Sequence, residues 1–170
     1  FNERLKNLNI DIIYCSPSQR TIETMKLMKG ELEIPVVFTE KLFEMGFGDW
    51  EGKNIIEISK KYPVESNNLY RHPGAYHPLT GETYQSVFDR AESLIDEILK
   101  KEENKNVLII THGITRKAIM KCFQDKSLEE YWNEEDIAKQ TSLTHVKIES
   151  DGSYKVVLKN DYSHWKHLEE

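Results

Sequence analysis

Two short aliphatic runs, each followed by polar residues and then by a helical pattern, constrain the fold of this chain more than any other feature. One is Val107-Leu108-Ile109-Ile110, which leads into Thr111-His112-Gly113. The other is Ile10-Asp11-Ile12-Ile13-Tyr14, which leads into a Ser-Pro segment and Arg20. Short apolar runs of this kind are typical of buried strands in a parallel sheet. Such sheets bind ligands at the carboxyl ends of their strands, so we expect Arg20 and His112 to meet in an anion pocket.

Strand-like and helical patterns alternate along the rest of the chain, which is typical of an α/β sheet with helices on its faces. We expect one domain over residues 1–170, because this length can bury one core and no repeat or linker interrupts it. A polar turn at 150–153 predicts a terminal hairpin. The expected strands are 10–14, 35–38, 107–111, 143–148 and 154–158, and the expected helices are 1–7, 21–29, 55–62, 82–101, 113–123 and 128–139.

Residues 63–80 are expected to form an irregular insertion, because they carry three prolines and a glycine. A long polar connection is more often a lid or a binding loop than filler. Arg71, His72 and His77 lie within it and could contact a carboxylate or a second phosphate of a substrate.

Charge and cysteine content exclude several classes of protein. The formal net charge of -6 argues against an extended cationic face for nucleic acid or anionic membrane. Cys15 and Cys122 stand far apart, so neither a disulfide framework nor a zinc site is indicated. No apolar stretch approaches the length of a membrane span and no signal-peptide pattern opens the sequence, so we expect a cytoplasmic location.

A glycine-rich, aromatic segment at 42–52 adds two carboxyl groups, Glu44 and Glu51. An arginine, a histidine and a carboxyl group together suit phosphoryl transfer. Positioned donors stabilise the charged oxygens, and a carboxyl group can protonate the leaving group without an obligatory metal ion. Spacing alone does not separate Glu44 from Glu51 in the second role.

These segments resemble the motifs of the histidine phosphatase superfamily, in the branch that includes cofactor-dependent phosphoglycerate mutases. They are similar, in order, to that family's SPxxRxxxT, LxExxFGxWEG, GES-to-R, SHG and NDxSH segments, and the match spans most of the chain. The matching residues are Ser16-Pro17-Ser18-Gln19-Arg20-Thr21-Ile22-Glu23-Thr24, Leu42-Phe43-Glu44 with Phe47-Gly48-Asp49-Trp50-Glu51-Gly52, Gly81-Glu82-Thr83 with Arg90, Thr111-His112-Gly113, and Asn160-Asp161-Tyr162-Ser163-His164.

The resemblance implies a three-layer α/β/α sandwich with a mostly parallel central sheet, as in phosphoglycerate mutases. One family signature does not occur in this sequence. The family's RHG segment, which supplies the phosphorylated histidine at the end of the first strand, has no counterpart here. Arg71-His72-Pro73-Gly74 is the nearest imitation, but no apolar strand precedes it. We therefore expect an N-terminal truncation, with the first strand absent from this chain and the nucleophilic histidine upstream of Phe1.

The resemblance also assigns roles to individual residues. Arg20 and His112 are the expected phosphate ligands, His112 as an imidazolium that bonds a transferring oxygen. Glu44, rather than Glu51, is the expected general acid. Ser16 is expected to cap the helix that begins near Pro17 and to face the anion, and Gly113 to open a helix beside it. The expected set is therefore Arg20, Glu44 and His112 for catalysis, and Ser16, Arg20, His112 and Gly113 for phosphate binding.

The activity implied is a phosphomonoester phosphatase that works through a phosphohistidine and acts on a small phosphorylated metabolite. The truncated chain itself is expected to be inactive. Two alternatives stay open: a phosphoglycerate mutase and a non-catalytic phosphoanion-binding module. No metal or cofactor is expected, apart from a bisphosphoglycerate primer in a mutase. The edge of the terminal hairpin leaves a homodimer open.

Overall fold

The computed structural model describes residues 2–124, 127–129 and 138–165 of the chain. At its centre lies a parallel sheet with strand order β2-β1-β3, formed by β1 (Ile12–Cys15), β2 (Val36–Phe38) and β3 (Val107–Ile110). In this sheet Ile13 pairs with Val36 on one side and with Leu108 on the other. The expected parallel strands are confirmed, with ends that shift by one or two residues.

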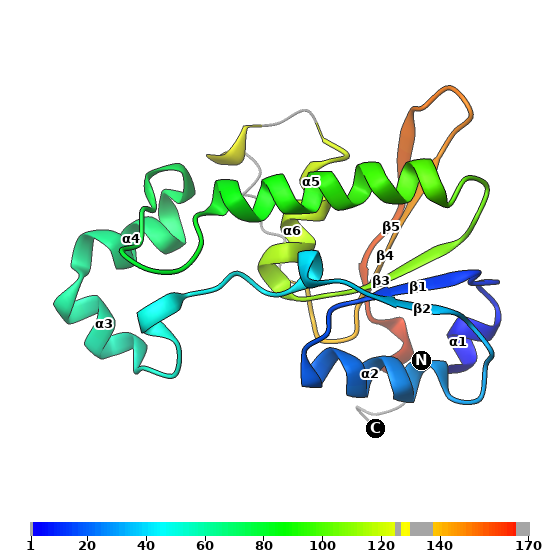
Figure 1. The fold of residues 1–170 in the computed structure, drawn as a ribbon, viewed down its shortest axis with the longest axis horizontal. Helices are drawn as coiled ribbons and strands as arrows, with labels where there is room; N and C mark the ends of the chain where they lie inside the picture. Colours follow the sequence, from blue (N-terminus) through cyan, green and yellow to red (C-terminus); the bar gives the residue numbers. More distant parts are fainter. Residues whose placement is uncertain (1, 125–126, 130–137, 166–170) are drawn as a thin grey trace.

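Helices cover both faces of this sheet (Figure 1). On one face lie α1 (Asn2–Lys6) and α2 (Gln19–Lys29). On the other face lie α5 (Tyr84–Lys101) and α6 (Gly113–Lys121). The expected α/β architecture with helices on both faces of a parallel sheet is therefore confirmed.

The side chains of β1 explain why its sequence is apolar at consecutive positions. Ile12 and Tyr14 belong to the core under α5 and α6. Ile13 and Cys15 belong to the core under α1 and α2. Because successive side chains of a strand point to opposite faces, a strand between two helix layers buries all of them.

Helix α5 begins two residues later than the periodicity predicts, because Thr83 caps it. The Thr83 side chain accepts a hydrogen bond of 3.1 Å from the backbone N–H of Ser86. Such a cap satisfies one of the N–H groups that a helix start leaves without an internal partner. Seven α5 side chains are buried against the sheet and α6: Tyr84, Val87, Phe88, Ala91, Leu94, Ile95 and Ile98.

The prediction of an irregular insertion at 63–80 is wrong over its first half. Residues 63–71 form α4 (Pro63–Arg71), which follows α3 (Ile55–Lys61) and precedes the short 3-10 helix η3 (Pro73–Ala75). Pro63 occupies the first turn of α4, where a residue without an N–H group costs nothing. The proline that suggests a break is therefore a helix start. We call residues 53–80 the helical excursion; they project from the body of the molecule (Figure 1).

The excursion leaves and rejoins the body through a narrow neck. The backbone N–H of Asp49 donates to Thr80 Oγ1 at 2.8 Å. Gly48 and Gly81 have φ angles of +54° and +95°. A Cβ atom on Gly81 would lie 2.5 Å from the Gly46 carbonyl oxygen, closer than any side chain permits. Glycine is required at this crossing for both conformation and space.

The terminal hairpin is confirmed as β4 (Leu143–Ile148) and β5 (Tyr154–Asp161), an antiparallel pair that forms its own two-stranded sheet. The strand β5 continues three residues past its expected end. Most of the helix expected at 128–139 lies outside the described residues. In the described ranges, no helix has the length and apolar character needed to cross a membrane.

Candidate active site

The strand pairing brings the two motifs of the sequence to one place. Cys15 pairs with Ile110 at the ends of β1 and β3, and the backbone N–H of Ser16 donates to the Ile110 carbonyl at 2.9 Å. Each strand then passes through an extended residue into a helix: Ser18 precedes α2 and His112 precedes α6. Two helix N-termini and their flanking polar residues therefore meet at the carboxyl edge of the sheet, as expected for a ligand site in an α/β fold.

Arg20 and His112 are 92 residues apart in sequence and hydrogen-bonded in the structure. The Arg20 Nε and Nη2 atoms lie 3.0 and 2.8 Å from His112 Nδ1. A guanidinium group can only donate, so Nδ1 accepts and carries no proton. The proton of a neutral imidazole then resides on Nε2. The expected meeting of Arg20 and His112 is what the structure shows.

The expectation of an imidazolium at His112 does not fit this geometry. Burial, followed by the positive charge of Arg20, lowers the pKa of His112, and the negative charge of Glu44 opposes this shift. His112 is only 9% exposed. Burial disfavours the charged form because the protein interior solvates it poorly. His112 is therefore a neutral Nε2–H donor in this arrangement.

Ser16 does not cap a helix, contrary to expectation. The residue at the N-cap of α2 is Ser18, since the helix begins two residues later than a start at Pro17 would place it. Ser16 is fully buried instead, and its Oγ lies 2.9 Å from His112 Nε2. Ser18 Oγ lies 3.4 Å from the same nitrogen. Ser16 and Arg20 thus hold the two nitrogens of the His112 ring from opposite sides.

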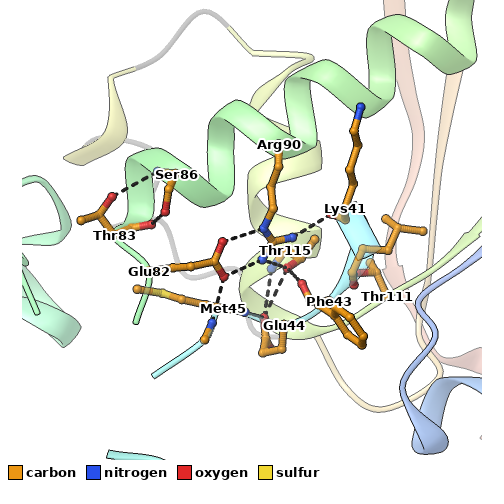
Figure 2. A network of polar contacts seen from close by, with 12 residues as sticks. Lys41, Phe43, Glu44, Met45, Glu82, Thr83, Ser86, Arg90, Thr111 and Thr115 are labelled. Atoms are coloured by element: carbon orange, nitrogen blue, oxygen red, sulfur yellow. Dashed lines mark hydrogen bonds and ion pairs between the residues drawn. The ribbon is translucent and has the colours of Figure 1, made fainter. Parts of the chain in front are cut away.

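Glu44 lies against the N-terminus of α6. Its Oε1 accepts hydrogen bonds from the backbone N–H groups of Met45, Ile114 and Thr115 at 3.1, 3.1 and 3.2 Å (Figure 2). The N–H groups at this end of a helix lack partners within the helix, and the Glu44 side chain supplies the acceptor. A Cβ atom on Gly113 would lie 3.6 Å from Glu44 Oε2. The Glu44 carboxyl group is therefore immediately beside the residue that follows His112.

The segment that carries Glu44 is docked on the site by two threonines. Thr111 Oγ1 donates to the Leu42 carbonyl at 2.9 Å, and Thr115 Oγ1 donates to the Phe43 carbonyl at 2.6 Å. Thr111 follows β3 and Thr115 lies on α6, so the two threonines flank His112 and hold the stretch that carries Glu44 beside it.

Glu51, the competing carboxyl group, has a different task. Its Oε1 accepts a 3.1 Å hydrogen bond from the backbone N–H of Phe47, and the residue is exposed. This contact closes the turn around the 3-10 helix η2 (Gly48–Trp50). The structure separates the two carboxyl groups that spacing left equivalent: Glu44 contacts α6 beside His112, and Glu51 stabilises its own loop.

Sequence reasoning missed Glu82 and Arg90 as parts of this site. Arg90 Nε and Nη2 contact the two carboxylate oxygens of Glu82 at 2.9 and 3.1 Å, and Nη2 lies 3.5 Å from Thr115 Oγ1 (Figure 2). Burial alone would raise the pKa of Glu82, but the Arg90 contact and a hydrogen bond from the Gly46 backbone outweigh it and lower that pKa. The similarity of residues 81–83 and Arg90 to a motif of the family was the signal in the sequence that could have identified them.

Arg71 and His72 are not brought to this site. Both are exposed at the end of α4, in the excursion that projects away from the sheet (Figure 1). His77 is exposed in the same excursion. Among the described residues, no group of three or more His, Cys, Asp or Glu side chains is arranged to hold a metal ion.

The chain resembles several proteins of known name over most of its length. It is 24% identical over 131 residues to phosphoserine phosphatase 1 of Hydrogenobacter thermophilus, covering 77% of this chain and 62% of that protein. It is 31% identical to the putative phosphoserine phosphatase 2 of the same organism, covering 94% of this chain and 76% of that protein. A 2,3-bisphosphoglycerate-dependent phosphoglycerate mutase of Cytophaga hutchinsonii is 28% identical, covering 74% of this chain and 61% of the mutase. The chain thus spans under two thirds of the first and third relatives.

Solved structures show the same fold. Bacillus stearothermophilus YhfR superposes with a TM-score of 0.89 at 33% identity, covering 96% of this chain and 80% of that one. The alpha-ribazole phosphatase of Shigella flexneri superposes with a TM-score of 0.78 at 21% identity, covering 94% and 81%, and so shows a shared fold alone. The sequence profile of the histidine phosphatase superfamily, branch 1, matches residues 1–161. The chain therefore belongs to the histidine phosphatase superfamily.

Proposed function

We propose that this protein is a phosphomonoester phosphatase that works through a phosphohistidine intermediate. The convergence of Arg20, His112 and Glu44 at the carboxyl edge of the parallel sheet carries this proposal. The relatives named as phosphoserine phosphatases favour a small phosphorylated metabolite as the substrate.

Arg20 and His112 supply the donors that a transferring phosphoryl group requires. The negative charge of that group is spread over three equatorial oxygens, so donors fixed in advance lower the barrier. The planar fork of Arg20 suits two of these oxygens. His112 donates from Nε2, and Ser16 keeps the ring aligned until a phosphate oxygen replaces its hydroxyl as the acceptor.

Glu44 acts as the general acid and then as the general base. As the nucleophile attacks phosphorus, the bond to the leaving oxygen breaks, and protonated Glu44 gives its proton to that oxygen. In the second step the Glu44 carboxylate takes a proton from water as the water oxygen attacks the phosphohistidine. Oε1 accepts from three backbone N–H groups, whereas Oε2 accepts only from the Ile114 N–H, at 3.3 Å and shared with Oε1, so Oε2, beside Gly113, is the oxygen that carries the proton.

The proposed mechanism takes as its nucleophile the histidine of the family's RHG segment, which does not occur in this sequence. His112 is poorly suited to attack, because Arg20 engages Nδ1 and Ser16 engages Nε2. In the described ranges β3 is the edge strand of the parallel sheet, and β4 and β5 form a separate sheet. A further parallel strand beside β3 would end next to His112. That position suits in-line attack on a phosphoryl group held by Arg20.

The test measures hydrolysis of p-nitrophenyl phosphate and of phosphoserine by the full-length protein, without added metal. We expect hydrolysis of both. We also expect Glu44→Gln to reduce kcat/KM for phosphoserine about 100-fold and for p-nitrophenyl phosphate much less, because kcat/KM reports the first step and nitrophenolate leaves without protonation. The matched variant Glu51→Gln should show no such difference. If Glu51→Gln shows it instead, Glu44 is the wrong carboxyl group.

Two outcomes would replace this function with another. Incubation with a bisphosphoglycerate and a monophosphoglycerate separates release of free phosphate from isomerisation, and isomerisation would show a phosphoglycerate mutase. Binding of inorganic phosphate with no turnover of any ester would show a non-catalytic phosphoanion-binding module.

A further inference from the structure

The ion pair between Arg90 and Glu82 contacts residues 41–46, the segment that carries Glu44, on both sides of that residue. Arg90 lies on α5, and its side chain is 16% exposed. Besides its two contacts with the Glu82 carboxylate, Arg90 donates from Nη1 to the Lys41 carbonyl at 2.7 Å. Paired donors aimed at one carboxylate fix orientation as well as distance, because the guanidinium group is planar and rigid.

Glu82 holds the other flank of the same segment. Its Oε2 accepts a 2.9 Å hydrogen bond from the backbone N–H of Gly46, and its own backbone N–H donates to the Gly46 carbonyl at 2.8 Å. Lys41 stands three residues before Glu44 and Gly46 two residues after it. The Arg90–Glu82 pair therefore clamps the backbone on both sides of the carboxyl group (Figure 2).

A third contact ties this clamp to α6. Arg90 Nη2 lies 3.5 Å from Thr115 Oγ1, while the backbone N–H of Thr115 donates to Glu44 Oε1 at 3.2 Å. The clamp thus touches the helix whose N-terminus holds the carboxyl group. In the hydrogen bonds of the described residues, neither Arg90 nor Glu82 contacts Arg20 or Ser16, so the clamp does not bind these phosphate ligands directly.

We propose that Arg90 and Glu82 are positioning residues for the general acid, which set where the Glu44 carboxyl group lies relative to the leaving oxygen. This inference rests on the proposed phosphatase function. It goes beyond a stabilising role. Loss of a residue that positions only the general acid slows some esters more than others, whereas loss of a residue that only stabilises the fold slows all esters equally. Displacing Glu44 slows the first step, transfer of the phosphoryl group to the enzyme, for esters that need a proton and much less for activated esters. The second step is common to both esters, so the difference is measured in kcat/KM, which reports the first step.

The experiment compares Arg90→Gln and Glu82→Gln with the wild type, all as the full-length protein, on phosphoserine and on p-nitrophenyl phosphate. We expect kcat/KM for phosphoserine to fall between about 10-fold and 100-fold, and kcat/KM for p-nitrophenyl phosphate to change less than about 3-fold. Glu82→Gln keeps the size of the side chain and an oxygen for Gly46, so the test does not rest on one variant. Arg90→Lys, which keeps the charge and loses the fork, should fall between wild type and Arg90→Gln.

Glu102→Gln is the matched control. Glu102 caps the far end of α5, its side chain is 9% exposed, and it pairs with Lys105 away from the site. Its removal should leave the ratio of the two substrates unchanged. In a Glu44→Gln background, Arg90→Gln should add no further preference for activated esters, because the group that it positions is already lost.

The possible failures are distinguishable. If the wild type hydrolyses neither ester, the proposed function itself fails. If Glu44→Gln shows the leaving-group dependence and Arg90→Gln and Glu82→Gln do not, or slow both esters equally, the positioning role is wrong and the phosphatase assignment stands.

Discussion

Two arginine–histidine pairs in this molecule have opposite environments. Arg20 and His112 lie far apart in the sequence and meet through direct hydrogen bonds at the ends of two paired strands. Arg71 and His72 are neighbours in the sequence and lie exposed on the helical excursion. The comparison shows that side chains are positioned for catalysis by a rigid scaffold. Strand ends fix a side chain from several directions, and adjacency along the chain does not.

The largest effect should separate these two pairs. We expect Arg20→Ala or His112→Ala to reduce kcat for p-nitrophenyl phosphate by a factor on the order of 100 to 1,000, because each removes a preorganised donor from the transition state. Arg71→Ala and His72→Ala should change it less than about 3-fold, because this ester has no second anionic group for the excursion to contact. Steady-state kinetics with circular dichroism as a folding control would measure this. Equal losses in the two pairs would break the comparison.

The neck between the two regions predicts a stability difference between two glycines. Gly81→Ala should lower the free energy of unfolding by about 2–4 kcal/mol, because it adds a clash to the strain of a positive φ angle. Gly52→Ala is the control: Gly52 also has a positive φ of +71°, but a Cβ atom there meets nothing within 4 Å. Strain alone should cost about 1 kcal/mol. Urea denaturation measures both, and equal losses would show that the neck is not tightly packed.

The smallest effect is the pH dependence of stability, which tests the difference between the buried His112 and the exposed His72. The pKa of His112 is lowered by burial and by Arg20, so just below its ordinary value of about 6.5 the unfolded chain binds a proton that the folded chain does not. The contribution of His112 to the free energy of unfolding should therefore be fully present above that pH and should decrease as the pH falls below it. Burial lowers the pKa of His164 in the same direction, so only the difference between wild type and His112→Gln isolates this contribution. The free energy of unfolding, measured by urea denaturation between pH 5 and 7, would contradict the prediction if it changed with pH equally in the wild type and in His112→Gln.

The sequence could predict those parts of the fold that depend on local pattern. Apolar runs and helical spacing located β1, β3 and α5, because burial on two faces or on one face imposes a recognisable period. The same reasoning failed at α4, because a proline at the first turn of a helix and a proline that breaks one look alike in sequence.

In the site, the strand-end rule predicted that Arg20 and His112 would meet, but not the contacts that decide their states. The protonation of His112 depends on a donor 92 residues away. The separation of Glu44 from Glu51 depends on which loop carboxyl group reaches α6. The role of Arg90 depends on backbone carbonyls and N–H groups, which carry no signal in a side-chain pattern.

The most direct test of the central claim is a crystal structure of the protein with orthovanadate, a tetrahedral anion that can add a fifth ligand. The account predicts vanadate oxygens within hydrogen-bonding distance of the Arg20 guanidinium group and of His112 Nε2, with Glu44 Oε2 beside an apical oxygen. Vanadate bound elsewhere, or the guanidinium, imidazole and carboxyl groups directed to different regions, would contradict it.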